Sequence, residues 1–182
     1  RSEYRLILRQ DNADERLTKY GCALGLVSRE RYETVKAKYA AVDAEIKRLE
    51  STHLAPGEAL SNALTALGTT PVNTGVSLAA LIRRPRVGYE DLREFDENRP
   101  ELPKPVINQV EIRLKYEGYI KRQLKQVEDF ARMEDKPLPE DIDYYAVPGL
   151  RTEARQKLSD VRPENFGRAS RISGVSPADM AA

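Results

Sequence analysis

The sequence contains no tryptophan, one cysteine (Cys22) and one histidine (His53). A disulfide framework within the chain is therefore impossible, and such sparing cysteine use is typical of a reducing compartment. A zinc site is disfavoured because the chain has too few soft ligands. Nothing in the sequence brings Cys22 and His53 together as a nucleophilic pair, so we interpret them as unrelated residues.

The chain also lacks the glycine patterns and the apolar runs of two further protein classes. It has no G-x-G and no G-x-x-x-x-G-K-[ST], so it carries neither the dinucleotide fingerprint nor a phosphate-binding loop. No apolar run approaches membrane-spanning length, and no signal peptide is visible. We therefore expect a soluble, cytoplasmic protein.

Charge is abundant but almost balanced. Thirty Lys and Arg residues face 29 Asp and Glu residues, which leaves a formal net charge of +1. Nucleic-acid binding would therefore have to come from local patches, because the bulk charge is too small. We expect the carboxylates on solvated helix faces among lysines and arginines, and no pair stands out for acid–base catalysis.

The chain opens on a segment with the pattern of a half-buried strand. Tyr4, Leu6 and Leu8 alternate with Arg5, Ile7 and Arg9, so one face is apolar and the other carries arginines. A lone strand cannot satisfy its backbone groups, and the chain starts without methionine, so we expect truncation at both ends and a missing sheet. On a strand, Arg1, Arg5 and Arg9 would share one face. That face suits phosphate or nucleic acid, or else a salt-bridge network with the missing part.

Helix signals dominate the remaining chain, with Ser28 and Ser77 as expected N-caps. Apolar residues at heptad spacing between positions 32 and 49 predict packing against another helix of the same domain, or a coiled coil. In the longest helix an apolar stripe drifts around the axis, and we expect Tyr116 and Ile120 to lead toward the core. The expected helices cover residues 14–23, 29–50, 59–67, 78–83, 89–95, 106–134, 152–160 and 163–172, and another begins at 176.

A basic stretch lies in the middle of the longest expected helix. Residues 113–125 carry five cations and one acid. Lys115, Tyr119 and Arg122 follow steps of four and three residues, so they share one helix face. A basic face with an aromatic ring suits RNA, and a solvated helix face is the alternative. Gly118 costs about 1 kcal/mol relative to alanine here, which predicts the close approach of another backbone, either a neighbouring helix or a ligand.

A third basic cluster lies near the C-terminus. Arg162, Arg168 and Arg171 surround Gly167 and Gly174. Residues 172–178 read as a tight turn before a helix start, with a weak similarity to the hairpin of helix-hairpin-helix DNA binders. An ordinary turn between two helices is the alternative interpretation.

Three ordered blocks of the chain strongly resemble the C-terminal part of the MnmG family, also called glucose-inhibited division protein A. The blocks are Arg1-Ser2-Glu3-Tyr4-Arg5-Leu6 with Asp11-Asn12-Ala13-Asp14, Lys115-Tyr116-Glu117-Gly118-Tyr119-Ile120, and Ala169-Ser170-Arg171-Ile172-Ser173-Gly174-Val175. The resemblance covers nearly the whole chain in this order, and it is least distinctive between residues 51 and 76.

The resemblance implies an enzyme that binds FAD and uses NADH and a folate one-carbon donor. Such enzymes add a carboxymethylaminomethyl group to C5 of the wobble uridine of certain tRNAs. They act with a GTPase of the MnmE type, they are typically homodimers, and their helical C-terminal region is associated with GTPase and tRNA contact. The flavin fingerprint and reactive cysteines belong to a preceding domain, and Cys22 matches none of them. The resemblance thus implies no catalytic, cofactor-binding or metal-binding residue in this chain.

Taken together, the residues and the resemblance predict a mainly α fold. We expect a helical bundle domain with a C-terminal three-helix subdomain, preceded by one strand left over from a missing α/β flavin-binding domain. The expected divisions are 1–18 for the end of the flavin-binding domain, 19–103 for a helical domain, 104–139 for a long basic helix, and 140–182 for a truncated C-terminal subdomain.

The resemblance turns two of the basic clusters into candidate sites. Predicted tRNA contacts are Arg5, Arg9, Lys115, Tyr119 and Arg122. Predicted contacts with the GTPase partner are Arg168, Arg171, Ile172, Gly174 and Val175. A helical protein–protein interaction module without an RNA role is the alternative, and it would bind its partner with weak salt dependence.

Overall fold

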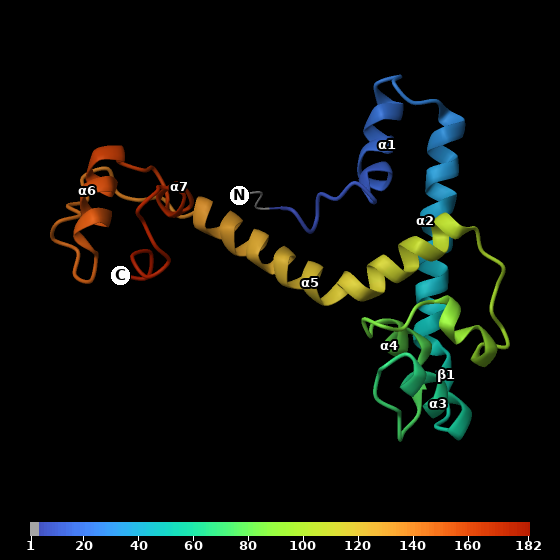
Figure 1. Cartoon of the computed structure of the whole chain (residues 1–182). Helices are drawn as coiled ribbons and strands as arrows, with labels where there is room; N and C mark the ends of the chain where they lie inside the picture. Colours follow the sequence, from blue (N-terminus) through green and yellow to red (C-terminus); the bar gives the residue numbers. More distant parts are fainter. Residues whose placement is uncertain (1–3) are drawn as a thin grey trace. The chain divides into compact units, whose positions relative to one another are not determined.

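The protein is described by a computed structural model that covers residues 4–182, apart from the side chains of residues 130 and 134. It is mainly helical, as the sequence predicts, and Figure 1 shows the order of its elements. The helices are α1 (Ala13–Ala23), α2 (Arg29–Ser51), α3 (Glu58–Ala66), α4 (Leu78–Ile82), the 3-10 helix η1 (Glu90–Phe95), α5 (Lys104–Glu134), α6 (Thr152–Val161) and α7 (Phe166–Ser170).

Two compact units divide the chain, Arg1–Ile120 and Lys121–Ala182. The division falls inside helix α5, which continues without interruption from the first unit into the second. Each unit has its own hydrophobic core. Within the described part of the chain, no helix is both long and apolar enough to cross a membrane.

The start of the first unit differs from the predicted strand. The backbone N–H groups of Ile7 and Leu8 both donate to the carbonyl oxygen of Tyr4, at 3.0 and 2.8 Å, so residues 4–8 form a turn. The strand prediction is wrong for residues 4–9, because among the described residues no strand lies alongside to take their backbone hydrogen bonds. Arg1, the first residue of the predicted arginine face, lies outside the described residues.

Both predicted serine caps are present. The Ser28 side chain accepts the Arg31 N–H at 3.2 Å at the start of α2, and the Ser77 side chain accepts the Ala80 N–H at 3.2 Å at the start of α4. Each bond satisfies one of the backbone donors that a helix leaves unpaired in its first turn. These local signals explain why both helices begin where the sequence predicts.

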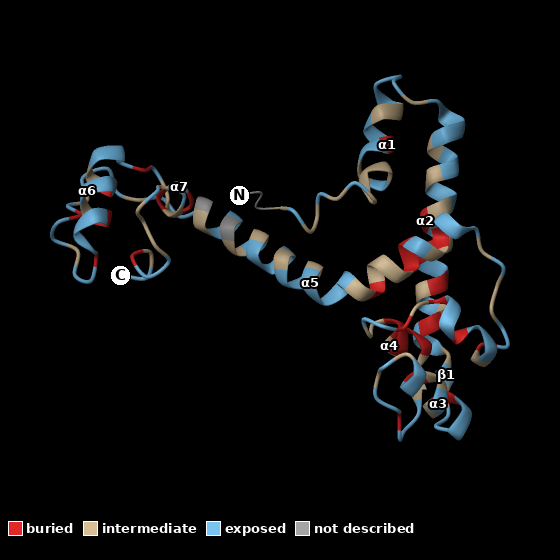
Figure 2. Cartoon of the chain, viewed as in Figure 1, coloured by how far each residue is buried: buried red, intermediate tan, exposed pale blue. Residues whose placement is uncertain are grey.

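The core of the first unit lies where α2, α4 and the beginning of α5 meet (Figure 2). Tyr39, Val42 and Leu49 of the heptad stripe are buried, so the stripe packs inside its own domain. Burying each large apolar side chain contributes about 1.5–3 kcal/mol. The fully buried large side chains are Leu49, Leu64, Leu78, Leu81, Ile82, Val42, Val87 and Val110.

A two-stranded antiparallel sheet, which no sequence pattern predicts, joins the end of α2 to the start of α4. Strand β1 (His53–Leu54) pairs with β2 (Val76–Ser77), with His53 opposite Ser77 and Leu54 opposite Val76. Strands of two residues are too short to show an alternating pattern. The pairing closes the loop that contains α3 against the core.

Among its described side chains, helix α5 contributes to the first core through its first turns. Val106, Val110 and Leu114 are buried, as the apolar stripe predicts. Tyr116 is 42% exposed, so the expectation that it leads into the core is wrong, and Leu124 is also exposed. The part of the helix after Leu114 is exposed to solvent on most of its sides, and this part carries most of the basic stretch.

The second unit packs a smaller core around α6 and α7. Its buried apolar residues are Tyr144, Leu150, Ala154, Leu158 and Ala169. The predicted third helix is a single turn, closed by a 3.2 Å bond from the Met180 N–H to the Ser176 carbonyl.

Candidate nucleic-acid interface

The basic stretch of α5 has exposed cations along most of its length, and Arg113 at its beginning is neutralised by carboxylates of the same unit. Lys121, Arg122 and Lys125 are exposed, and Lys115 is half-buried. Arg113 differs, because its guanidinium pairs with Glu15 and with Asp43, the latter at 2.5 Å. These carboxylates keep the pKa of Arg113 raised against the effect of its burial. Three of the five cations of the stretch therefore lie at the protein surface.

Gly118 lies in the centre of this stretch and is exposed. A Cβ atom added to Gly118 would meet nothing within 4 Å outside its own helix among the described residues. The sequence predicted a close neighbour here, either a helix or a ligand. The described residues supply no neighbouring helix at this position.

Two exposed tyrosines flank the glycine. The ring centroids of Tyr116 and Tyr119 lie 6.4 Å apart, with the ring planes inclined at 54°. Tyr119 is 55% exposed. The guanidinium carbon of Arg9 lies 5.5 Å from the centroid of Tyr116, over its ring. Such a cation–π contact is typically worth about 0.5–1 kcal/mol at a partly exposed site.

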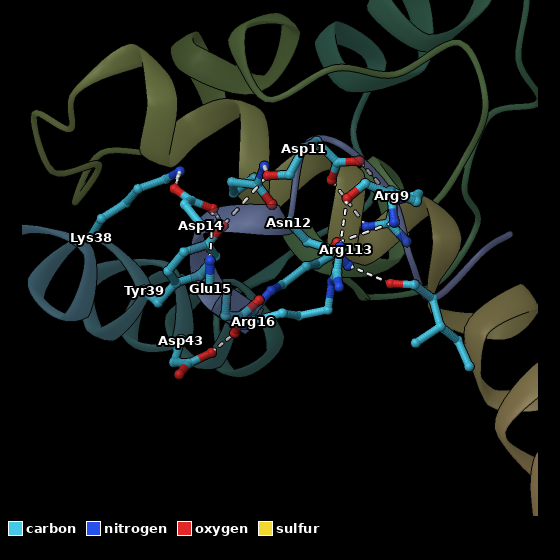
Figure 3. Close-up of polar contacts among 12 residues, drawn as sticks. Arg9, Asp11, Asn12, Asp14, Glu15, Arg16, Lys38, Tyr39, Asp43 and Arg113 are labelled. Atoms are coloured by element: carbon cyan, nitrogen blue, oxygen red, sulfur yellow. Dashed lines mark hydrogen bonds and ion pairs between the residues drawn. The ribbon is translucent and has the colours of Figure 1, made fainter. Parts of the chain in front are cut away.

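A bidentate ion pair holds Arg9 in place (Figure 3). Its Nε and Nη2 donate to the two carboxylate oxygens of Asp11 at 2.9 and 3.1 Å, and its Nη1 donates to the Leu6 carbonyl at 2.6 Å. The hydrogen bond and charge of Arg9 lower the pKa of Asp11. Only 15% of the Arg9 side chain is exposed. Arg5, by contrast, is exposed, so the structure separates the two arginines that the strand prediction had placed on one face.

Asn12 closes the turn that carries Arg9. Its side-chain amide donates to the Ile7 carbonyl at 2.8 Å, and its side-chain oxygen accepts the Arg9 N–H at 3.2 Å and Arg16 Nε at 2.9 Å. Gln109 of α5 donates to the Asp11 carbonyl at 2.8 Å. The N-terminal turn is thereby fixed to the helix that bears the two tyrosines.

Asp14, in the first turn of α1, anchors that helix to α2. It accepts the Tyr39 hydroxyl at 2.6 Å and Lys38 Nζ at 2.8 Å (Figure 3). Burial alone would raise the pKa of Asp14, but the bonds from Lys38 and Tyr39 outweigh it and lower the pKa. Burial and the neighbouring Asp14 carboxylate raise the pKa of the Tyr39 hydroxyl. The Arg113 guanidinium lies over the Tyr39 ring, 5.1 Å from its centroid.

Among the described residues, no group of three or more His, Cys, Asp or Glu side chains is arranged to hold a metal ion. The interface therefore consists of cations, aromatic rings and a gap in the helix surface. This combination suits a polyanion that also offers flat rings, the chemistry of single-stranded RNA.

The family comparisons divide the chain within a few residues of the boundary between the two units. Residues 29–124 match the family described as the tRNA modifying enzyme MnmG/GidA C-terminal helical domain. Residues 126–182 match the C-terminal helical bundle of the same enzyme. The chain belongs to the MnmG/GidA family. It represents the C-terminal region of this tRNA uridine modification enzyme.

Curated relatives and solved structures agree with that assignment. The chain is 54% identical over 180 residues to the tRNA uridine 5-carboxymethylaminomethyl modification enzyme MnmG of Caldicellulosiruptor saccharolyticus, covering 99% of the chain and 29% of the relative. It is 48% identical to the MnmG of Geobacillus kaustophilus, with the same coverage. A GidA structure from Aquifex aeolicus matches with a TM-score of 0.62 and 39% identity, over 100% of the chain and 28% of the GidA chain. The chain thus spans less than a third of the length of these MnmG relatives.

The residues predicted to contact the GTPase partner lie in the second unit of this MnmG region. Arg168 is exposed and pairs with Glu164 at 2.9 Å, and Arg171 is exposed. Ile172 and Val175 pack against the second core, so their side chains are partly buried. Gly174 has φ of +99°, and a Cβ there would meet the Glu153 carboxylate at 2.6 Å. The tight turn therefore presents arginines outward and apolar residues inward.

A clamp of side chains holds this turn against α6. Asp179 accepts Arg151 Nη2 at 2.6 Å and both the N–H and the hydroxyl of Ser176, at 2.8 and 2.6 Å. Arg151 also donates to the Gly174 carbonyl at 3.0 Å. The bonds from Arg151 and Ser176 lower the pKa of Asp179. Sequence reasoning recognised Ser176 as a helix start but missed its partner Asp179, three residues on, the usual spacing of a capping box.

A buried ionic network was also missed. Glu45 of α2 and Asp96 are almost fully buried, and both pair with Arg48, at 2.7 and 2.6 Å. The Tyr89 hydroxyl donates to Glu45 at 2.7 Å. The expectation that the carboxylates lie on solvated faces is wrong for these two residues. The available signal was spacing, because Glu45 falls three residues after Val42 and four before Leu49, on the inward stripe.

Proposed function

We propose that this chain is the tRNA-contacting region of an enzyme that adds a carboxymethylaminomethyl group to the wobble uridine of tRNA. The observation that carries the proposal is the exposed half of α5, where cations surround two exposed tyrosines. Membership of the MnmG/GidA family supports a tRNA ligand over other polyanions.

The predicted residues take different roles in this proposal. Lys115, Arg122 and Arg5 would meet phosphates, and the Tyr119 ring would contact a base or ribose. Arg9 would act mainly by fixing the Tyr116 ring, because its guanidinium is already bound by Asp11. Salt-dependent affinity is the signature of the phosphate contacts.

Charge reversal tests the proposal directly. We expect Lys115→Glu and Arg122→Glu each to weaken tRNA binding about tenfold. Each should also reduce the salt slope, the slope of log affinity against log salt concentration, by about 1 per lost contact. Fluorescence anisotropy with labelled, unmodified tRNA over a salt series measures both quantities. Lys47→Glu, at an exposed position of α2, makes the same charge change outside the interface. Equal affinities for all three variants would contradict tRNA binding by α5.

A protein-interaction module without an RNA role is the second candidate, and an exposed apolar surface favours it. Leu17, Tyr20 and Leu24 lie at steps of three and four on α1 and its C-cap, and all are exposed, as is Leu26 beyond them. Exposed apolar patches often mark protein contacts. This candidate predicts partner binding that depends weakly on salt and no measurable affinity for tRNA.

We further propose that the second unit contacts a GTPase of the MnmE type through Arg168 and Arg171, with Ile172, Gly174 and Val175 shaping the turn that follows them. The double variant Arg168→Glu/Arg171→Glu should abolish capture of that GTPase in a pull-down while leaving the second core folded. Deleting the segment instead would remove Ala169 from the core and unfold it. Unimpaired capture by the double variant would place the contact elsewhere.

The remaining family properties belong to the same proposal. We propose that the enzyme carrying this region binds FAD and NADH and acts as a cytoplasmic homodimer, and that residues 1–18 are the end of its flavin-binding domain. The residues of this chain do not fit a dinucleotide, because no G-x-G occurs among them. The region would therefore supply binding of tRNA and partner, with no chemical step of its own.

A further inference from the structure

The missing side chain of Gly118 has no explanation within the fold. Glycine is the least favourable helix residue after proline, so an interior glycine usually has a packing reason. Here a Cβ would meet nothing within 4 Å among the described residues outside the helix itself. The helix therefore forgoes the stability of alanine at this position without any gain in internal packing.

Cations surround the gap that Gly118 leaves. Lys115 lies three residues before it, Lys121 three residues after it and Arg122 four residues after it. Positions three and four apart are neighbours on the surface of a helix, and α5 is uninterrupted from Lys104 to Glu134. The bare Cα of Gly118 is thus the low point among three positive side chains, with Lys125 two turns further on the same face.

We infer that Gly118 is the seat of an RNA phosphate, which lies against the helix surface while Lys115, Lys121 and Arg122 donate to its oxygens. This inference rests on the proposed tRNA-binding function and assigns one contact within it. The absence of a side chain lets the phosphodiester chain approach closely enough for several cations to share one phosphate. Tyr119, the next residue and 55% exposed, lies beside this contact within reach of the adjoining nucleotide.

The gap fits a phosphodiester better than an acidic protein. A glutamate or aspartate reaches a lysine through its own flexible side chain, so the partner backbone can remain distant. A phosphate is part of the nucleic-acid backbone itself, so a close contact brings the whole strand to the helix. A glycine in the helix leaves no side chain at this position to obstruct that approach.

The test uses substitutions that improve the helix but fill the gap. Gly118→Ala and Gly118→Leu leave every charge in place, and both residues favour helix more than glycine. We expect both variants to unfold at a higher temperature and yet to bind unmodified tRNA more weakly, about tenfold for leucine, with a salt slope reduced by about 1. Opposite effects on stability and affinity are not expected of a residue with a merely structural role.

The matched control is Gly57→Ala. Gly57 is exposed, its φ of −163° suits any residue, and a Cβ there also meets nothing within 4 Å. This variant should leave tRNA affinity and salt slope unchanged.

Two results would overturn the inference. If Gly118→Leu is more stable and binds tRNA with unchanged affinity and slope, no phosphate sits at Gly118. The proposed function would still stand in that case if Lys115→Glu weakens tRNA binding. If Gly118→Leu instead impairs capture of the GTPase and spares tRNA, the occupant of the gap is a protein.

Discussion

At the scale of the residue, the first unit depends on a charge cluster that the core surrounds. Arg48 bridges Glu45 and Asp96, whose side chains are only 2% and 4% exposed. Hydrogen bonds from Arg48 to both carboxylates raise the pKa of Arg48, so the guanidinium stays charged at neutral pH. Buried ion pairs add little net stability compared with apolar packing, but removing one partner leaves the others buried without a counter-charge.

Arg48→Met is therefore expected to destabilise the first unit by about 3–5 kcal/mol, because two buried carboxylates lose their common partner. Urea unfolding followed by circular dichroism measures the free energy of unfolding. The control Arg29→Met removes the exposed pair with Glu33, where the arginine side chain is 78% exposed, and should cost less than about 1 kcal/mol. Equal losses in the two variants would contradict a special role for the buried cluster.

At the scale of the element, the contact between α1 and α2 depends on pH in two ways. Asp14 must be ionised, and the hydroxyl of Tyr39 must be protonated. The folded-state pKa of Asp14 is lowered from its ordinary value of 3.8. The contribution of Asp14 to the free energy of unfolding is therefore present above pH 3.8 and is lost as the pH falls below 3.8. The folded-state pKa of Tyr39 is raised above its ordinary value of 10.0. The hydroxyl therefore donates its hydrogen bond to Asp14 below pH 10.0, and the stabilisation from this bond is lost as the pH rises further. The contact is thus expected to be complete between these limits.

Asp14→Asn should weaken the contact by about 1 kcal/mol at neutral pH, because the charged acceptor of Lys38 and Tyr39 is lost. It should also flatten the loss of stability on acidification. Urea midpoints measured from neutral pH to below 3.8 test both effects. The exposed Glu128→Gln, on α5, removes a carboxylate that is largely in solvent and should leave the acid limb unchanged.

The sequence predicted elements well where a local signal fixes them. Ser28 and Ser77 mark helix starts through their own side chains, and the early α5 stripe is buried because its spacing matches the helix period. The strand at residues 4–9 failed because alternation alone does not supply a partner strand. Tyr116 was misplaced because no local pattern tells where a long helix leaves the core.

The candidate site was predictable in part for the same reason. The spacing of Lys115, Tyr119 and Arg122 is local to one helix, and the structure keeps it. The Arg9–Tyr116 contact joins residues far apart in the sequence, so only the fold could reveal it. The pairing of Arg113 with Glu15 and Asp43 is long-range as well, and it neutralises one cation of the basic stretch, which was not among the predicted tRNA contacts.

At the scale of the whole molecule, two separate cores imply two separate unfolding events. The first core gathers around α2, α4 and the start of α5, and the second around α6 and α7. A single two-state treatment is then inappropriate, because each core can lose its packing while the other remains. The Arg151–Asp179 clamp belongs to the second core alone.

Asp179→Ala is accordingly expected to lower the midpoint of one thermal transition and to leave the other unchanged. The substitution removes the shared acceptor of Arg151 and Ser176, so the turn that carries Gly174 loses its hold on α6. Differential scanning calorimetry separates the two transitions. Arg168→Ala, which removes an exposed pair with Glu164, serves as the control and should move neither midpoint. A shift of both midpoints by Asp179→Ala would show that the cores unfold together.

The exposed tyrosine pair on α5 also has an optical consequence. The chain contains no tryptophan, so tyrosine fluorescence is not quenched by energy transfer to an indole. The environment of the tyrosine rings can therefore be followed without any added label. Tyr116 and Tyr119 are exposed, and Tyr116 lies under an arginine, so a nucleobase that stacks on either ring would quench its emission. Replacing the two rings one at a time with phenylalanine would assign that signal within the nine tyrosines of the chain. The proposed interface thus carries its own spectroscopic reporter.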